Sequence, residues 1–134
     1  DFKLVGKRGT TAALSYTGIN YETIRINDKL YISIGCVFDK NGSFVVQGNT
    51  NNEILDHEQR HFDITYLYTC KFIDRLKKEQ ILTESKIDLI YNNILIELDD
   101  FQEKYDASIR NPIQDHSIQI EWDNKINIEL SKYN

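Results

Sequence analysis

The sequence predicts an α+β fold in which a small N-terminal antiparallel sheet packs on a long helix, with two further helices behind it. Residues 12–46 are rich in β-branched and aromatic residues that alternate with polar ones, as strands require. Residues 52–78 repeat apolar side chains at the helical period, and so do residues 84–105 and the stretch after Pro112. With 134 residues, the chain is expected to form a single domain that buries a core without disulfides or metal.

Composition narrows the class of protein. The chain is 40% apolar and 28% charged with few Pro and Gly, which indicates a globular rather than a disordered chain. Its net charge is −5 and its Lys and Arg are scattered, so we expect no nucleic-acid partner. No apolar run is long enough to span a membrane, so we expect no transmembrane segment. We also expect the protein to be a monomer. The chain has no Met, so we expect a processed product whose missing leader is compatible with export to the periplasm or cell envelope.

Turn chemistry divides the strand region. Asn27 and Asp28 join two alternating runs and predict a tight hairpin. Residues 39–42, which include Asn41 and Gly42, predict a second hairpin, and Thr17 and Gly18 mark a further break. We therefore expect three to four strands, with residues 43–46 as the candidate edge strand beside a substrate cleft.

The cysteines and the helix ends give further expectations. Cys36 and Cys70 could form one disulfide in an exported protein, or could remain two buried thiols. Thr50 or Asn52 is a suitable N-cap for the long helix, and Thr83 for the second helix. Asn111 and Pro112 are a favourable cap and first-turn pair for the third helix.

Residues 57–61 read His-Glu-Gln-Arg-His, an HExxH motif inside the long predicted helix. Because 3.6 residues make one turn, His57 and His61 lie one above the other on the same face, where both rings can bind one ion. Glu58 lies one position round the helix, where it can activate a water molecule without binding the metal. Two of the three histidines in the chain belong to this motif, which favours a zinc site.

A catalytic zinc usually takes three protein ligands and one water. His116 is the only other histidine and is the obvious third ligand, provided that the third helix packs back on the motif. The competing ligands are the downstream carboxylates of Glu79, Glu84 and Asp106, and a site without a third protein ligand is also open.

Other side chains near the motif have two interpretations each. The HExxH spacing could be an ordinary polar helix face, with His57 paired to Asp56 or Glu53. Asp63 could orient an imidazole by accepting its second N–H, or could be structural. A tyrosine could steady a developing oxyanion. We choose Tyr105, because it closes the second helix before the His116 stretch; the other candidates are Tyr66, Tyr68 and Tyr91.

The run LDHEQRHFDIT extends HExxH by Phe-Asp-Ile. This run, the most specific one, and further stretches on either side of it resemble a bacterial family described as predicted secreted zinc-dependent proteases. The upstream runs AALSYTGINY and VFDKNGSFV resemble the family's strand region. Downstream, the Tyr-Asp pair at 105–106, the His-Ser pair at 116–117 and QIEW at 119–122 resemble its second conserved run. The resemblance covers nearly the whole chain and implies a zincin-like fold.

The motif and the resemblance lead to one expected function. We expect a zinc-dependent hydrolase, a metallopeptidase that cleaves peptide or amide bonds in a peptide or protein substrate. Zn²⁺ would be held by His57, His61 and His116, with Glu58 activating the water and Tyr105 assisting. The alternative is a catalytically inactive zincin-fold envelope or binding protein, and a third interpretation is a hydrolase acting on a peptidoglycan-type amide.

Overall fold

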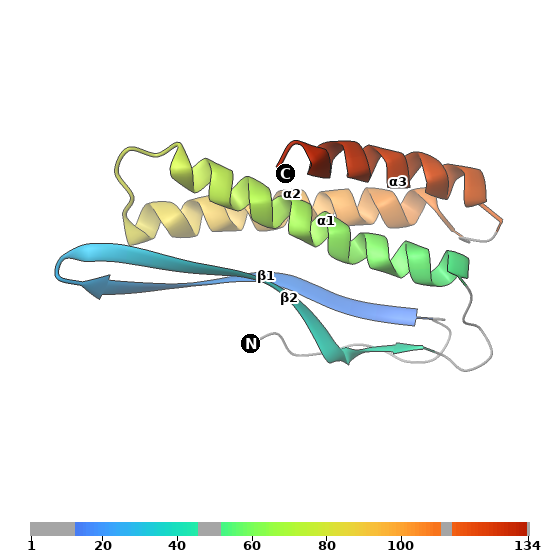
Figure 1. Ribbon diagram of the computed structural model, residues 1–134, viewed down its shortest axis with the longest axis horizontal. Helices are drawn as coiled ribbons and strands as arrows, with labels where there is room; N and C mark the ends of the chain where they lie inside the picture. The colour runs from blue at the N-terminus through green and yellow to red at the C-terminus, as the bar shows by residue number, and fades with distance from the viewer. Residues whose placement is uncertain (1–12, 46–51, 111–113, 134) are drawn as a thin grey trace.

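The computed structural model describes the backbone of residues 13–45, 52–110 and 114–133. Two strands are followed by three helices: β1 (Ala13–Ile26), β2 (Lys29–Val45), α1 (Asn52–Lys77), α2 (Glu84–Ser108) and α3 (His116–Ser131). The β1–β2 hairpin and α3 lie on opposite sides of α1 (Figure 1). α2 packs along α1, and its first half also contacts β1, through Tyr21 with Asp88 and Tyr91 with Ile19. This arrangement confirms the predicted α+β class, with α1 as the element on which the others pack.

The hairpin turn is the one that the sequence predicts. β1 and β2 pair in antiparallel fashion from Ile26 opposite Lys29 onward. Asn27 and Asp28 have φ angles of 52° and 67°, the left-handed values that a tight I′-type turn needs at both central positions. Asn and Asp tolerate this conformation better than most residues, so the local sequence explains the turn.

The sheet has two strands within the described residues, so the expectation of three to four strands is wrong. Asn41 and Gly42 lie inside β2, and Val37 and Phe44 on either side of them both pair with β1. The register shifts there, so that residues 40–43 of β2 lie opposite Ser15. Turn-forming residues also suit a bulge, which inserts extra residues into one strand without reversing it. The further break predicted at Thr17 and Gly18 likewise lies inside a strand, β1.

The helices follow the predicted bounds closely. α1 starts at Asn52 and ends one residue before the expected end, and α2 starts at Glu84 but continues to Ser108, three residues further than expected. Thr83 is the N-cap of α2, since its hydroxyl accepts from the Lys86 backbone N–H at 3.1 Å. α3 starts at His116 with Asp115 as its N-cap, so the predicted start at Asn111 and Pro112 is wrong by four residues. Asn52 is the first residue of α1, and the alternative cap Thr50 lies outside the described residues.

The core fixes α1 against its neighbours. Apolar side chains from all three helices have no exposed surface, and burying each one stabilises the fold by roughly 1.5–3 kcal/mol. They are Ile64, Leu67 and Phe72 of α1, Ile87 and Ile94 of α2, and Ile126 of α3. The hairpin is tied to the same core through Ile19, whose carbonyl accepts from the Tyr91 hydroxyl at 2.6 Å. The end of α2 and the start of α3 lie against the first turns of α1, where Asp106 and Gln119 both contact His57.

Two other expectations concern the cysteines and membranes. Cys36 and Cys70 are free thiols, both half-buried. Burial raises the pKa of the Cys36 thiol, as for a thiol that packs as a small apolar side chain. No helix in the described part of the chain combines the length and the hydrophobicity that a membrane span needs.

Candidate metal centre

The first turns of α1 bring three potential ligands together. The ligand atoms of His57, Glu58 and His61 all lie within 4.8 Å of one another. His57 is buried, whereas Glu58 and His61 are half-buried. The spacing of the motif thus has the local consequence that helix geometry predicts: these side chains form a group that could hold a metal ion.

Asp106, near the end of α2, lies between the two histidines. Its Oδ1 atom is 3.1 Å from His57 Nε2 and 2.7 Å from His61 Nε2. One carboxylate oxygen therefore contacts the same nitrogen of both rings. The continuation of α2 to Ser108 keeps Asp106 on a regular helix that packs against α1.

The opposite nitrogen of each ring faces a glutamine. His57 Nδ1 lies 2.8 Å from Oε1 of Gln119, on α3. His61 Nδ1 lies 2.5 Å from Oε1 of Gln102, on α2. Each imidazole is thus held between an amide oxygen and the shared Asp106 carboxylate, which fixes both ring orientations. Polar groups of this kind behind a histidine are what keep a metal ligand oriented.

The electrostatics of this group favour positive charge between the rings. Burial works to lower the pKa of His61, but the hydrogen bond and negative charge of Asp106, together with Gln102, raise it overall. Burial works to raise the pKa of Asp106, but hydrogen bonds and charge from His57 and His61 bring it well below its usual value. A proton can supply this positive charge, and so can a divalent cation bound by the same atoms.

The side chain of Tyr105 packs inside the core against His57, which differs from its predicted role as an oxyanion donor. Its side chain is wholly buried, and its ring stacks on His57 with centroids 4.6 Å apart and planes 14° apart. The hydroxyl donates to the His57 backbone carbonyl at 2.9 Å and accepts from Gln119 Nε2 at 2.7 Å. Burial raises the pKa of this hydroxyl far above its usual value. Because its hydrogen is already donated to the backbone, Tyr105 positions His57 and is not the oxyanion donor that we expected.

His116 does not join the histidine pair. It is the first residue of α3 and is exposed, and it is not part of the group formed by His57, Glu58 and His61. One turn later, Gln119 is buried and faces His57. The residue that contacts both histidine rings is Asp106, one of the carboxylates that the sequence left open.

The other carboxylate candidates have partners elsewhere. Glu79 pairs with Lys86 at 2.7 Å, and Glu84 pairs with Arg25 at 3.3 Å. Both pairs lie near the connection between α1 and α2, and neither glutamate belongs to the group around the histidines.

Asp63 and Asp56 belong to an acidic cluster around Arg60. Asp63 accepts from Arg60 Nη1 at 3.3 Å, so it does not orient an imidazole as one interpretation suggested. Arg60 Nε also lies 3.1 Å from Asp123 Oδ1 and 3.7 Å from Asp56 Oδ1. Burial and a hydrogen bond with Asp123 raise the pKa of Asp56 to about 6. Asp56 therefore pairs with Asp123, and the partners of His57 are Gln119 and Asp106.

Sequence reasoning missed the two glutamines. Gln102 and Asp106 are four residues apart on α2, so they share one helix face, and Tyr105 lies beside them. A polar face of this kind on an otherwise apolar helix side is a usable signal. The sequence signal for Gln119 is weaker, because nothing in the residues around it indicates that this one glutamine is buried.

Comparisons with protein-family models, with curated proteins and with solved structures give no match to this chain. The resemblance of the motif region to a zinc-protease family thus remains a prediction.

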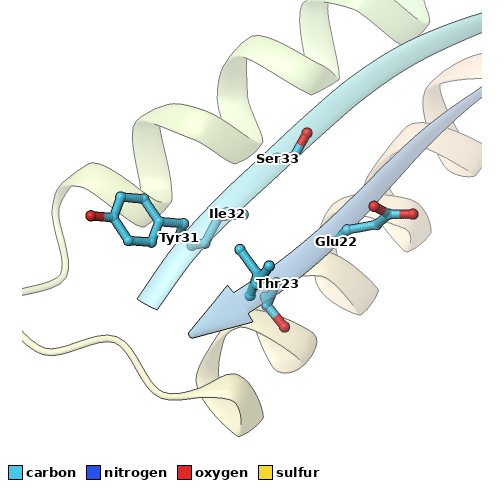
Figure 2. A pocket seen from close by; sticks show the side chains of 6 residues that line it. Glu22, Thr23, Tyr31, Ile32 and Ser33 are labelled. Atoms are coloured by element: carbon cyan, nitrogen blue, oxygen red, sulfur yellow. The ribbon is translucent and has the colours of Figure 1, made fainter. Parts of the chain in front are cut away.

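A hollow near the hairpin turn is lined by residues of the two strands (Figure 2): Glu22, Thr23, Ile24, Tyr31, Ile32 and Ser33. The hairpin turn and the first turns of α1, which carry the motif, lie at opposite ends of the molecule (Figure 1).

Proposed function

We propose that this protein is a zinc-dependent hydrolase whose metal ligands are His57, His61 and Asp106. The observation that carries the proposal is the convergence of both Nε2 atoms on Asp106 Oδ1, at 3.1 and 2.7 Å. Two imidazoles and one carboxylate form a donor set that catalytic zinc sites use, and it leaves a fourth position for water or substrate. The same donor set also binds Fe²⁺, so the identity of the metal is part of the test.

We assign Glu58 the role of general base. It follows His57 directly, and its carboxylate lies within 4.8 Å of a nitrogen of each ring. Zinc, when bound, acts as a Lewis acid and lowers the pKa of a coordinated water to about 7. Glu58 would take the proton from the attacking water and pass it to the leaving amine. The substrate class, a peptide or protein amide, and the exported location rest on the motif and on the family resemblance.

The test compares the wild-type protein with Glu58→Gln after stripping with a chelator and reloading with zinc. We expect one zinc per chain in both proteins by elemental analysis. We expect cleavage of a quenched peptide library by the wild type, and a rate lower by roughly 10²–10⁴-fold in the variant, as for loss of a general base. Glu103→Gln is the matched control: Glu103 is exposed on α2, and this variant should keep the wild-type rate.

Each outcome decides a separate point. A wild-type protein that binds no metal at micromolar concentrations excludes the metal site. Stoichiometric zinc without cleavage by the wild type excludes the hydrolase and leaves the binding-protein alternative. Equal cleavage by wild type and Glu58→Gln excludes Glu58 as the base.

A further inference from the structure

We propose that Gln102 and Gln119 are positioning residues that hold the hydrogen of each motif imidazole on Nδ1, so that both Nε2 lone pairs face Asp106. The inference rests on the proposed metal site, because it explains how that site is prepared to bind a cation. Which nitrogen of a neutral histidine carries the hydrogen is set by the hydrogen bond that the other nitrogen makes.

The orientation of the Gln102 amide follows from its other partner. Its Nε2 atom lies 3.0 Å from the backbone carbonyl oxygen of His61. A carbonyl oxygen only accepts hydrogen bonds, so the NH₂ group must point there and Oε1 must point at the ring. Since Oε1 in turn only accepts, His61 Nδ1 donates to it and carries the hydrogen. The Thr65 hydroxyl donates its own hydrogen to the His61 carbonyl oxygen at 3.1 Å, so it accepts from Gln102 Nε2 at 3.2 Å and supports the same orientation.

Gln119 is fixed in the same sense by different groups. Its Nε2 atom donates to Asp123 Oδ1 at 2.8 Å and to the Tyr105 hydroxyl at 2.7 Å. The Tyr105 hydroxyl uses its own hydrogen for the His57 carbonyl, so it can only accept from Gln119. Both amide hydrogens are therefore assigned, and Oε1 accepts from His57 Nδ1. Gln119 is 1% exposed, so water does not compete for these bonds.

The consequence is a set of three converging acceptors. With both rings neutral, the Nε2 lone pairs of His57 and His61 face Asp106 Oδ1, which also carries lone pairs. Such an arrangement is repulsive until a cation or a proton lies between the three atoms. The two glutamines thus hold the histidines in the tautomer that metal binding requires.

The experiment observes the tautomers directly. Protein labelled with ¹⁵N-histidine is prepared metal-free, and long-range ¹H–¹⁵N spectra of the rings are recorded. In the wild type we expect a hydrogen on Nδ1 of both motif histidines, in addition to any proton that Nε2 shares with Asp106; exposed His116 serves as the internal reference. In Gln102→Leu the acceptor at His61 Nδ1 is lost, so the hydrogen moves to Nε2 and bonds Asp106. Gln119→Leu should change His57 alone.

Zinc affinity supplies the second readout. By chelator competition, each leucine variant should bind zinc about 10–100-fold more weakly, the usual effect of removing the group behind a metal-bound histidine. Gln102→Glu retains an acceptor and should restore both the Nδ1–H form and most of the affinity. Gln59→Leu is the matched control, because Gln59 lies exposed on α1 and bonds Asp63; this variant should change neither readout.

The two proposals fail separately. Wild-type rings that carry a hydrogen on Nε2 alone, or rings whose Nδ1 hydrogen does not respond to the leucine substitutions, overturn the positioning role even where zinc affinity falls. Nδ1–H rings in a wild-type protein that binds no metal support the positioning role and exclude the proposed function. The wild-type spectrum decides the point even if a leucine variant fails to fold.

Discussion

The substitution Tyr105→Phe separates two roles for this residue. The hydroxyl makes two buried hydrogen bonds, to the His57 carbonyl at 2.9 Å and from Gln119 Nε2 at 2.7 Å, and the residue has no exposed surface. Phenylalanine keeps the ring that stacks on His57 and removes only these bonds. Each is worth about 0.5–1.5 kcal/mol net, so we expect a loss of about 2 kcal/mol in the free energy of unfolding.

Urea unfolding of the metal-free protein is the assay, followed by the fluorescence of Trp122, the only tryptophan. Its ring lies 5.6 Å from that of Tyr105, so the signal reports on this part of the core. For a domain of this size, about 2 kcal/mol also lowers Tm by about 6–10 °C. Tyr31→Phe is the control, since Tyr31 is 49% exposed and should change stability by less than about 0.5 kcal/mol.

The reasoning is refuted if Tyr105→Phe unfolds like the wild type, within about 0.5 kcal/mol. A normal stability together with a large loss of turnover would restore the oxyanion role that the sequence suggested. A loss of stability with a smaller loss of zinc affinity is the expected result, because the hydroxyl acts on His57 through its backbone and through Gln119.

Two further predictions concern the third ligand and an ion pair. Asp106→Ala should weaken zinc binding by more than about 10-fold. His116→Ala should leave the zinc affinity unchanged, because His116 is exposed at the start of α3. Calorimetric titration with zinc compares the two variants, and a loss of affinity in His116→Ala but not in Asp106→Ala would make His116 the ligand. Arg75 donates to both carboxylate oxygens of Glu97 at 2.7 Å, and this lowers the pKa of Glu97 from its usual 4.5. The pair therefore stabilises the protein above about pH 4.5 and ceases to do so as the pH falls through the lowered pKa. Both side chains are more than a third exposed, so Glu97→Gln should lower the free energy of unfolding by at most about 1 kcal/mol at pH 7. In urea unfolding measured at decreasing pH, the stability difference between variant and wild type should disappear towards about pH 3. A stability difference that stays constant with pH would contradict the ion-pair account.

The secondary structure was largely predictable, and the sheet shows where local patterns stop being sufficient. Asn27 and Asp28 form the predicted turn because both adopt positive φ. Asn41 and Gly42 have the same chemistry, yet β2 continues through them. A turn and a bulge draw on the same residue types, and the choice between them depends on whether the following residues pair with β1. That is a non-local contact, which the local sequence does not encode.

The candidate site likewise has one part that the local sequence predicts and one part that it does not. The relation of His57, Glu58 and His61 is a property of one helix, so the spacing alone predicted it. The third ligand was chosen by residue type, since His116 is the only remaining histidine. Chain topology is the better guide, because α1 and α2 are joined by the short connection 78–83 and pack together as neighbouring helices (Figure 1).

In such a helical hairpin, a residue at a given distance before the connection lies opposite a residue at a similar distance after it. His57 lies 20 positions before Lys77, and Asp106 lies 22 positions after Glu84. His61 lies 16 positions before Lys77, and Gln102 lies 18 positions after Glu84. Because both helices rise 1.5 Å per residue, the helix bounds place Asp106 and Gln102 at the same height along the helix pair as His57 and His61. The contacts of these two residues with the histidines therefore follow from the lengths of two helices, the shortness of the connection between them, and the face on which α2 packs against α1.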